Sequence, residues 1–119
     1  MQEDNIKTYV KKIYEICSRD TCYDKVVDKW TENNRFWGHC AVVALLINDK
    51  FGGEIKKCNI EQEDISHYFN EIDGIDYDYT ISQYSDKPII KDIKTANREK
   101  MLSTKSTEER YSALKKLLK

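Results

Sequence analysis

The 119-residue sequence lacks the features that mark several common classes of protein. It has no excess of either charge, with 20 basic and 21 acidic residues, and so neither the basic field of a nucleic-acid-binding protein nor an acidic tail for a charged partner. Its longest apolar run, residues 41–47, is far too short to cross a bilayer. It contains no internal repeat and no low-complexity segment. We therefore expect one domain spanning residues 1–119, with no nucleic-acid or membrane partner.

The use of cysteine indicates a reducing compartment. The first residues are polar and lack the apolar stretch of a secretory signal, which predicts a cytoplasmic protein. Cys17, Cys22, Cys40 and Cys58 could form two disulfides in a secreted chain, but in the cytoplasm they are expected to be reduced thiols. Cys17 and Cys22 are spaced more widely than a CxxC pair, and neither histidine is spaced as a partner ligand, so we expect no metal there.

Three segments have the pattern of helices. In residues 4–18 the apolar residues recur at helical spacing with lysines opposite, which predicts an amphipathic helix. Residues 40–51 are apolar nearly all round for two turns, which predicts a helix buried on most sides and ended by Gly52-Gly53. Residues 107–118 carry an apolar face and basic residues near their end, and predict a C-terminal helix.

The chain between the last two helices has the pattern of strands. Residues 53–60 alternate apolar and polar side chains, and residues 65–72 and 75–82 flank Asp73-Gly74, a strong signal for a two-residue hairpin. Residues 82–95 contain the only proline and are expected to be irregular. We therefore predict an α+β fold with N-terminal helices, a buried central helix, an antiparallel sheet of three or more strands and a C-terminal helix.

The predicted hairpin brings a histidine and an aspartate together. A two-residue turn places Ile72 opposite Ile75, which makes His67 and Asp78 diagonal neighbours on one face of the sheet. An imidazole and a carboxylate can bridge the separation of roughly 7–8 Å between such backbones. A shift of the register by one residue would turn Asp78 to the opposite face relative to His67. The proposed pair therefore depends on the turn.

Cys40 is the candidate nucleophile because it follows Gly38-His39 and opens the buried helix. The helix dipole and the unpaired N–H groups of the first turn would stabilise a thiolate, and the same amides can stabilise an oxyanion. Packing this helix across the sheet would bring Cys40 to His67, as general base and later acid, with Asp78 fixing the imidazole tautomer. A thiol at a helix start, followed by histidine and carboxylate on consecutive strands, is the order of papain-like and transglutaminase-like enzymes. No cofactor is required.

Each residue also has a plainer interpretation. A cysteine at the edge of an apolar helix is usually core, and a strand histidine is usually a hydrogen-bonded structural residue. His39 is a rival base, an alternative hydrogen-bond donor near the oxyanion, or a cap of the helix. Trp37, beside Gly38, can belong to the core or form one wall of a substrate cleft. Taken together, in this order and with this hairpin, the three residues bring the catalytic interpretation level with the plainer ones.

The sequence also resembles a known family. The stretch WGHCAVVALLINDKFGGEI resembles the signature GQCAVTALVVQDYFGGEI of the YunG-like family of small bacterial proteins. SHYFNEIDG resembles the HYWN segment of that family, and Asp78-Tyr79-Thr80 resembles its DLT. The tail, residues 98–118, is similar to the family's pattern of an arginine, a leucine pair, T-x-x-R-Y and a leucine-rich helix. The similarity spans residues 30–119.

The resemblance implies that the family's cysteine, histidine and carboxylate fall on Cys40, His67 and Asp78. The family's usual glutamine before the cysteine is His39 here, and the loop before it lacks the proline often present. A side-chain amide can donate to an oxyanion without titrating, whereas histidine changes its charge near neutrality.

We therefore expect a thiol enzyme that forms a thioester between Cys40 and an amide or related acyl carbon. Water would resolve the thioester in a peptidase, amidase or deamidase, and an amine would resolve it in a transferase. A protein or peptide is the expected substrate. The alternatives are a non-catalytic module that binds a peptide or partner protein at the cleft, and a metal site using Cys40, His67 and His39 or Asp78. The sequence carries no signal for the oligomeric state.

Overall fold

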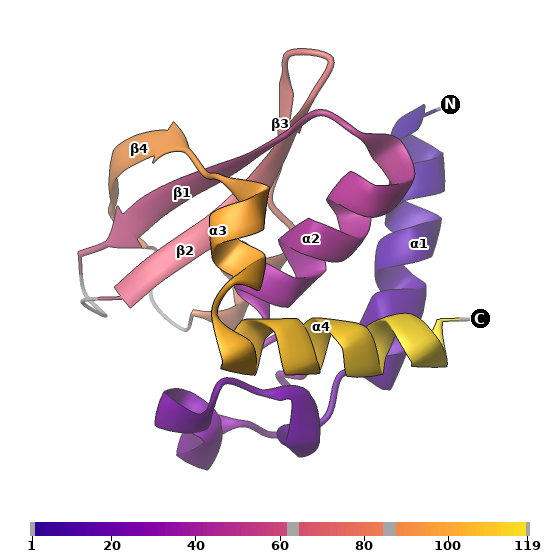
Figure 1. Ribbon diagram of the computed structural model, residues 1–119, viewed down its shortest axis with the longest axis vertical. Helices are drawn as coiled ribbons and strands as arrows, with labels where there is room; N and C mark the ends of the chain where they lie inside the picture. Colours follow the sequence, from indigo (N-terminus) through magenta and orange to yellow (C-terminus); the bar gives the residue numbers. More distant parts are fainter. Residues whose placement is uncertain (1, 62–64, 85–87, 119) are drawn as a thin grey trace.

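The computed structural model describes residues 2–61, 65–84 and 88–118. Helices lie at both ends of the chain and an antiparallel sheet lies between them (Figure 1). The predicted α+β class is therefore confirmed. The elements in chain order are α1 (Gln2–Ile16), the 3-10 helices η1 (Arg19–Thr21) and η2 (Asp24–Lys29), α2 (Cys40–Phe51), β1 (Glu54–Ile60), β2 (Ile65–Ile72), β3 (Ile75–Tyr77), η3 (Thr80–Gln83), β4 (Ile90–Thr95), α3 (Arg98–Leu102) and α4 (Lys105–Leu117).

Helix α2 forms the centre of the fold, as its apolar sequence predicts. Every residue from Val42 to Ile47 is buried. The helix packs against β1 and β2 on one side and against α1 and α4 on others (Figure 1). Gly52, with φ of 75°, ends the helix and donates its N–H to the carbonyl of Asn48. The helix predicted over residues 40–51 is confirmed at both ends.

The two outer helices are confirmed with small shifts of their ends. Helix α1 begins at Gln2 and ends at Ile16, and α4 begins at Lys105. Each contacts α2 and buries an apolar stripe, which explains why the helical spacing was visible in the sequence. The buried residues are Ile6, Val10 and Ile13 in α1 and Tyr111 and Leu114 in α4.

The strands form one antiparallel sheet in the order β3-β2-β1-β4. Asp73 and Gly74 have positive φ of 53° and 79°, as a type I′ turn requires, and Ile72 pairs with Ile75. The predicted register is therefore confirmed. The strand expected over residues 75–82 is wrong beyond Tyr77, because the chain leaves the sheet there and turns into η3.

The region expected to be irregular, residues 82–95, contains the fourth strand, although residues 85–87 of it lie outside the described part. Strand β4 pairs with β1 and forms one edge of the sheet. All its residues are exposed, so its sequence lacks the alternation of buried and exposed side chains that marks a strand. A bulge opposite Cys58, where Asp92 has φ of 59°, interrupts the pattern further.

The C-terminal part of the chain holds α2 in place. Arg98 donates through Nη1 to the carbonyl of Leu45 at 3.1 Å and to Oδ1 of Asn48 at 2.9 Å. Its Nη2 forms an ion pair with Asp49 and also donates to the hydroxyl of Tyr111. The same hydroxyl donates to Asp49. The network joins α3 and α4 to the buried helix, so the tail is an integral part of the fold.

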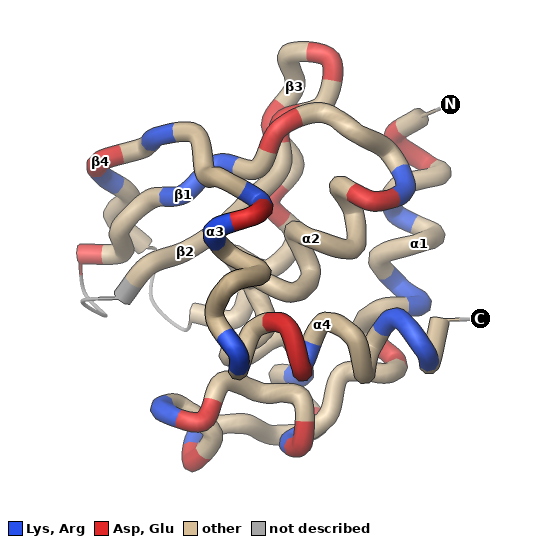
Figure 2. Tube along the Cα trace, in the orientation of Figure 1, with Lys and Arg blue, Asp and Glu red and all other residues tan. Residues whose placement is uncertain are grey.

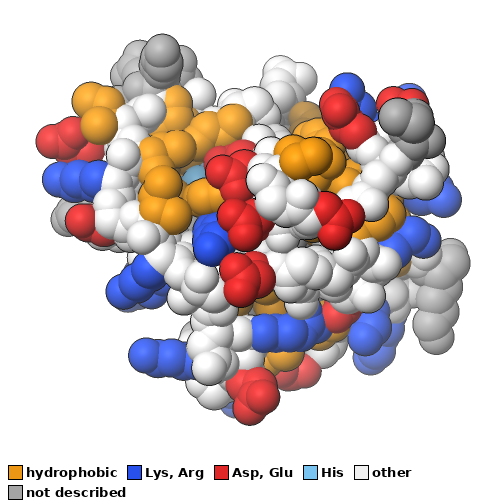
Figure 3. Space-filling model, turned by 90° about the horizontal axis from the view of Figure 1, so that it is seen from above, with side chains coloured by type: hydrophobic (Ala, Val, Ile, Leu, Met, Phe, Trp, Pro, Cys, Tyr) orange, Lys and Arg blue, Asp and Glu red, His pale blue; other side chains and the backbone are white. Residues whose placement is uncertain are grey.

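The surface is mixed in character. Lys and Arg are interspersed with Asp and Glu in each of the four α-helices and in β1 and β4, whereas β2 and β3 each carry one acidic residue and no Lys or Arg (Figure 2). On the face shown in Figure 3, hydrophobic side chains gather in two groups with acidic side chains between them. Within the described ranges, no helix has both the length and the apolar character needed to span a membrane.

Candidate active site

The loop before α2 fixes the position of Cys40. Gly38 has φ of 74°, and a side-chain carbon at this position would lie 2.4 Å from the sulfur of Cys22, so only glycine fits without a shift of its neighbours. The Gly38 N–H donates to Oε1 of Gln83 at 3.0 Å, and its carbonyl accepts from the N–H of Tyr23 at 3.1 Å. The backbone is thus held on both sides two residues before the thiol.

Cys40 differs from the other three cysteines in its exposure. All four are free thiols, but Cys17, Cys22 and Cys58 are buried while Cys40 is partly exposed. Burial raises the pKa of Cys17 to about 12 and the pKa values of Cys22 and Cys58 to about 11. These three thiols are therefore unreactive near neutral pH. Cys40 presents its sulfur 4.0 Å from the carbonyl oxygen of Ser66.

His67 and Asp78 form a direct pair. The side chain of His67 is fully buried, and its Nε2 lies 2.9 Å and 2.8 Å from the two carboxylate oxygens of Asp78. Asp78 follows Tyr77, the last residue of β3, so the hairpin brings the two side chains together although Asp78 lies just outside the strand. Nε2 donates to the carboxylate, which fixes the orientation of the ring and leaves Nδ1 for another partner.

The second partner of His67 is the thiol. Cys40 raises the pKa of His67 through side-chain hydrogen bonding and charge. Because the carboxylate occupies Nε2, we assign the contact with sulfur to Nδ1. The hydroxyl oxygen of Tyr84 lies 3.4 Å from the same nitrogen, and the tyrosine ring packs edge-on against the imidazole with centroids 5.5 Å apart. The structure thus brings Cys40, His67 and Asp78 together, with the imidazole between the sulfur and the carboxylate.

The His67 imidazole is charged at neutral pH. Burial lowers its pKa, but the hydrogen bonds to Asp78 and Cys40 and their negative charges outweigh burial and raise the pKa to about 9. The folded state therefore binds this proton more tightly than the unfolded state, whose imidazole titrates near 6.5. The resulting stabilisation is complete below about pH 6.5 and is lost as the pH rises through about 9.

His39 occupies a different environment. Its side chain is fully buried, and burial lowers its pKa to about 4, so the ring is neutral. Nδ1 donates to the carbonyl of Trp37 at 2.8 Å, and Nε2 accepts from the hydroxyl of Thr21 at 2.8 Å. This geometry gives His39 a structural role in the loop. It leaves no free ring nitrogen for the base or oxyanion roles considered for this residue.

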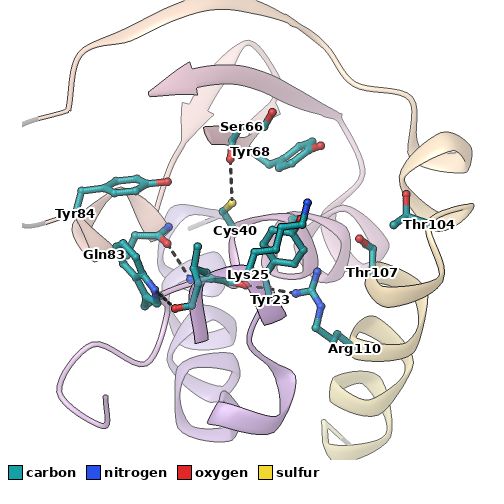
Figure 4. A pocket seen from close by; sticks show the side chains of 14 residues that line it. Tyr23, Lys25, Cys40, Ser66, Tyr68, Gln83, Tyr84, Thr104, Thr107 and Arg110 are labelled. Carbon is teal, nitrogen blue, oxygen red and sulfur yellow. Dashed lines mark hydrogen bonds between the residues drawn. The ribbon is translucent and has the colours of Figure 1, made fainter. Parts of the chain in front are cut away.

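A cavity of about 470 Å³ opens beside Cys40 (Figure 4). Trp37 and Gly38, the residues expected at a cleft, line it, and the indole N–H of Trp37 is held by the carbonyl of Val26 at 2.7 Å. Helix α4 contributes Arg110 to the wall. The remaining lining residues are Tyr23, Lys25, Val26, Ala41, Ser66, Tyr68, Gln83, Tyr84, Thr104 and Thr107.

Three residues of this site were not singled out from the sequence. Gln83 and Tyr84 follow the hairpin in a region without periodicity, so no pattern marks them. Arg110 had one available signal, because Thr107 lies three residues before it and the two share a face of α4. The sequence of α4 was interpreted only through its apolar stripe. The polar pair of Thr107 and Arg110 indicates a second face of the helix that is a candidate for function.

A metal site requires several His, Cys, Asp or Glu side chains that converge on one point. In the part of the chain that the structure describes, no group of three or more His, Cys, Asp and Glu side chains is placed so that it could hold a metal ion. Cys40 and His67 instead act on each other, since Cys40 raises the pKa of His67. A metal ion bound between them would have to replace that interaction.

The chain belongs to the YunG family, since the family model described as YunG protein matches residues 4–119. The chain is similar to the uncharacterized protein YunG of Bacillus subtilis (strain 168), with 37% identity over 87 residues, which are 73% of this chain and 72% of the relative. No solved structure gives a significant match. Membership confirms the resemblance found in the sequence and supplies no activity, so the function is argued from the geometry.

Proposed function

We propose that the protein is a cysteine-dependent enzyme acting on an amide or related acyl carbon. Cys40 is the nucleophile, His67 transfers protons, and Asp78 orients the imidazole. The observation that carries the proposal is the environment of His67, whose buried ring is hydrogen-bonded to the Asp78 carboxylate and whose pKa is raised by both Asp78 and Cys40. An imidazole that is protonated at neutral pH, beside a partly exposed thiol, can stabilise the sulfur anion that attacks the carbonyl carbon.

In the first half-reaction the sulfur of Cys40 donates an electron pair to the carbonyl carbon. A C–S bond forms and the carbonyl π electrons move to oxygen. The first N–H groups of α2 have no acceptor within the helix and can donate to this oxyanion. When the intermediate collapses, the C–N bond breaks and the His67 imidazolium gives its proton to the leaving amine. The product is a thioester on Cys40.

In the second half-reaction the neutral His67 accepts a proton from water. The water oxygen bonds to the thioester carbon as the C–S bond breaks, which releases a carboxylic acid and restores the thiolate–imidazolium pair. An amine in place of water gives a new amide. The same residues therefore support a peptidase, amidase or deamidase on one hand and an acyl transferase on the other, without a cofactor. The cavity beside Cys40 suits a side chain or a chain end of a peptide or protein.

The order of the thiol, the imidazole and the carboxylate along the chain supports a particular class of cysteine enzyme. The thiol begins a buried helix, and the imidazole and carboxylate follow on and just after an antiparallel hairpin. Papain-like and transglutaminase-like enzymes use this order. We extend the proposal to a reduced core of that type.

Selective alkylation tests the nucleophile. At pH 7 iodoacetamide is expected to label Cys40 at least about 100-fold faster than Cys17, Cys22 or Cys58, because a pKa raised from 9.0 to about 11 removes about 99% of the reactive thiolate. Mass spectrometry of peptides from timed reactions measures each rate, with the urea-unfolded chain as the reference. Equal, slow labelling of all four thiols would favour the non-catalytic binding module instead.

A second measurement tests the acyl chemistry itself. With p-nitrophenyl acetate, the wild-type protein should release one equivalent of p-nitrophenol per chain in a rapid burst and gain an acetyl group on Cys40. The Cys40→Ser variant should show neither signal. Fast alkylation without acetylation would restrict the proposal to a reactive thiol that does not act on acyl carbons.

A further inference from the structure

Arg110 lines the cavity and forms no ion pair with a described acidic residue. Its Nη1 donates to the carbonyls of Gly38 at 3.3 Å and Thr21 at 3.4 Å, and its Nε donates to the hydroxyl of Ser106 at 3.3 Å. The ion pairs found among the described residues do not include Arg110. Two of its three nitrogens are thus anchored to the protein, and Nη2 is left for a ligand within the described structure.

The guanidinium is also partly removed from water. The ring of Tyr23 packs against it, with the guanidinium carbon 5.5 Å from the ring centroid. Burial lowers the pKa of Arg110, yet arginine stays charged at physiological pH. Cys40 and Asp24 act on it electrostatically without an ion pair. A partly desolvated cation that lacks a bound counter-ion is stabilised by an anionic ligand.

The cavity wall has one sign of charge. Lys25 and Arg110 line it, and no described Asp or Glu does. Thr107 adds a hydroxyl beside Arg110. In Figure 4 these two residues lie on one side of Cys40 and Gln83 lies on the other. A group bound in the cavity on the Arg110 side of Cys40 would therefore meet positive charge.

We infer that the substrate carries a carboxylate that binds Arg110 while its carbonyl carbon meets Cys40, an inference that rests on the proposed function. The remaining nitrogen, Nη2, can donate a charge-assisted hydrogen bond to a carboxylate oxygen, and partial burial strengthens the contact. The cavity of about 470 Å³ has room for one residue-sized group. The substrate class is an amide whose acidic group is either a side-chain carboxylate or a chain-end carboxylate.

Three chloroacetyl compounds with one skeleton test the inference. Chloroacetyl-glutamine amide is neutral, chloroacetyl-glutamate α-amide carries a side-chain carboxylate, and chloroacetyl-glutamine carries a chain-end carboxylate. Each alkylates Cys40 by forming a C–S bond as the C–Cl bond breaks and chloride leaves. Mass spectrometry of the whole protein and of its peptides gives the rate at Cys40 for each compound.

Wild-type Cys40 should react about tenfold faster with at least one acidic compound than with the neutral one, and the faster compound identifies the source of the carboxylate. In Arg110→Gln this ratio should fall to about one while the rate with the neutral compound is retained. Lys116→Gln is the matched control. It removes the same charge from an exposed position of α4 and should keep the wild-type ratio.

An equal rate for all three compounds in the wild type, or an unchanged ratio in Arg110→Gln, overturns the inference. A common loss of rate with every compound in Arg110→Gln also overturns it, because Arg110 would then act only by holding the Gly38 loop. If circular dichroism shows that Arg110→Gln does not fold, two other measurements replace it: the rates of Arg110→Lys, and the wild-type rates with added KCl. Each must show a smaller ratio of the acidic to the neutral rate than the wild type without added salt. If Cys40 reacts slowly with all three compounds but still prefers an acidic one, the result contradicts the proposed function and supports the anion site.

Discussion

Replacement of His67 by alanine is expected to slow the alkylation of Cys40 at pH 7 by about 100-fold or more. The variant loses the hydrogen bond between the imidazole and the sulfur and the positive charge that the imidazole carries at this pH. It also leaves the Asp78 carboxylate without the partner that neutralises it. Both changes disfavour a sulfur anion, because the Asp78 carboxylate that remains nearby is negative, as the sulfur anion is.

The measurement is the rate of iodoacetamide labelling at Cys40 as a function of pH. The wild-type rate should stay high through neutral pH and change near pH 9, where His67 loses its proton, whereas the His67→Ala rate should rise with pH as for an ordinary thiol. Circular dichroism checks that the variant remains folded.

His39→Gln is the matched control for the loss of an imidazole. His39 is as buried as His67, but its ring nitrogens bond Trp37 and Thr21. The control should therefore keep a rate close to that of the wild type. Equal losses in the two histidine variants would show that reactivity depends on packing around the loop and would contradict the assignment of His67.

Replacement of Gly38 by alanine is expected to destabilise the protein by about 2–5 kcal/mol, which combines a left-handed backbone at about 1–2 kcal/mol with overpacking at about 1–3 kcal/mol. The new carbon would lie 2.4 Å from the sulfur of Cys22 and 3.0 Å from a methyl group of Val26. The loop has little freedom to relax, because hydrogen bonds to Gln83 and Tyr23 hold Gly38 on both sides.

Urea unfolding of Gly38→Ala and Gly52→Ala separates the two costs. Gly52 has nearly the same φ, 75° against 74°, but no atom lies within 4 Å of an added carbon there. Gly52→Ala should therefore lose only the backbone contribution, about 1–3 kcal/mol at its φ of 75° and ψ of −149°. Adding Cys22→Ala should recover part of the loss in Gly38→Ala and none in Gly52→Ala. Equal losses at the two glycines would contradict the contact with Cys22.

The parts of the site that could be predicted from sequence are those set by local chemistry. Gly52-Gly53 ended the central helix, and Asp73-Gly74 fixed the hairpin register by its length alone. Because antiparallel pairing follows from the turn by counting residues, the approach of His67 to Asp78 was readable. The position of Cys40 followed in the same way from the abrupt start of the apolar helix.

The parts that could not be predicted depend on packing between distant segments. Strand β4 is exposed along its whole length, so it carries no pattern of burial to detect. Arg110 reaches the cavity because α4 packs on α2 and on η1, a relation between residues about 70 positions apart. The role of His39 stayed open among several options in the sequence, because its two partners lie on one loop and one 3-10 helix that carry no periodic signal.

The central claim is that the buried imidazole of His67 joins a sulfur and a carboxylate and carries a positive charge at neutral pH. Nitrogen-15 NMR of the histidine rings tests it directly, with His39 as an internal reference that should stay neutral down to about pH 4. His67 is expected to be protonated on both nitrogens at pH 7 and to lose its proton with a pKa of about 9, a value that Asp78→Asn should lower. A neutral His67 ring at pH 7 would contradict the account.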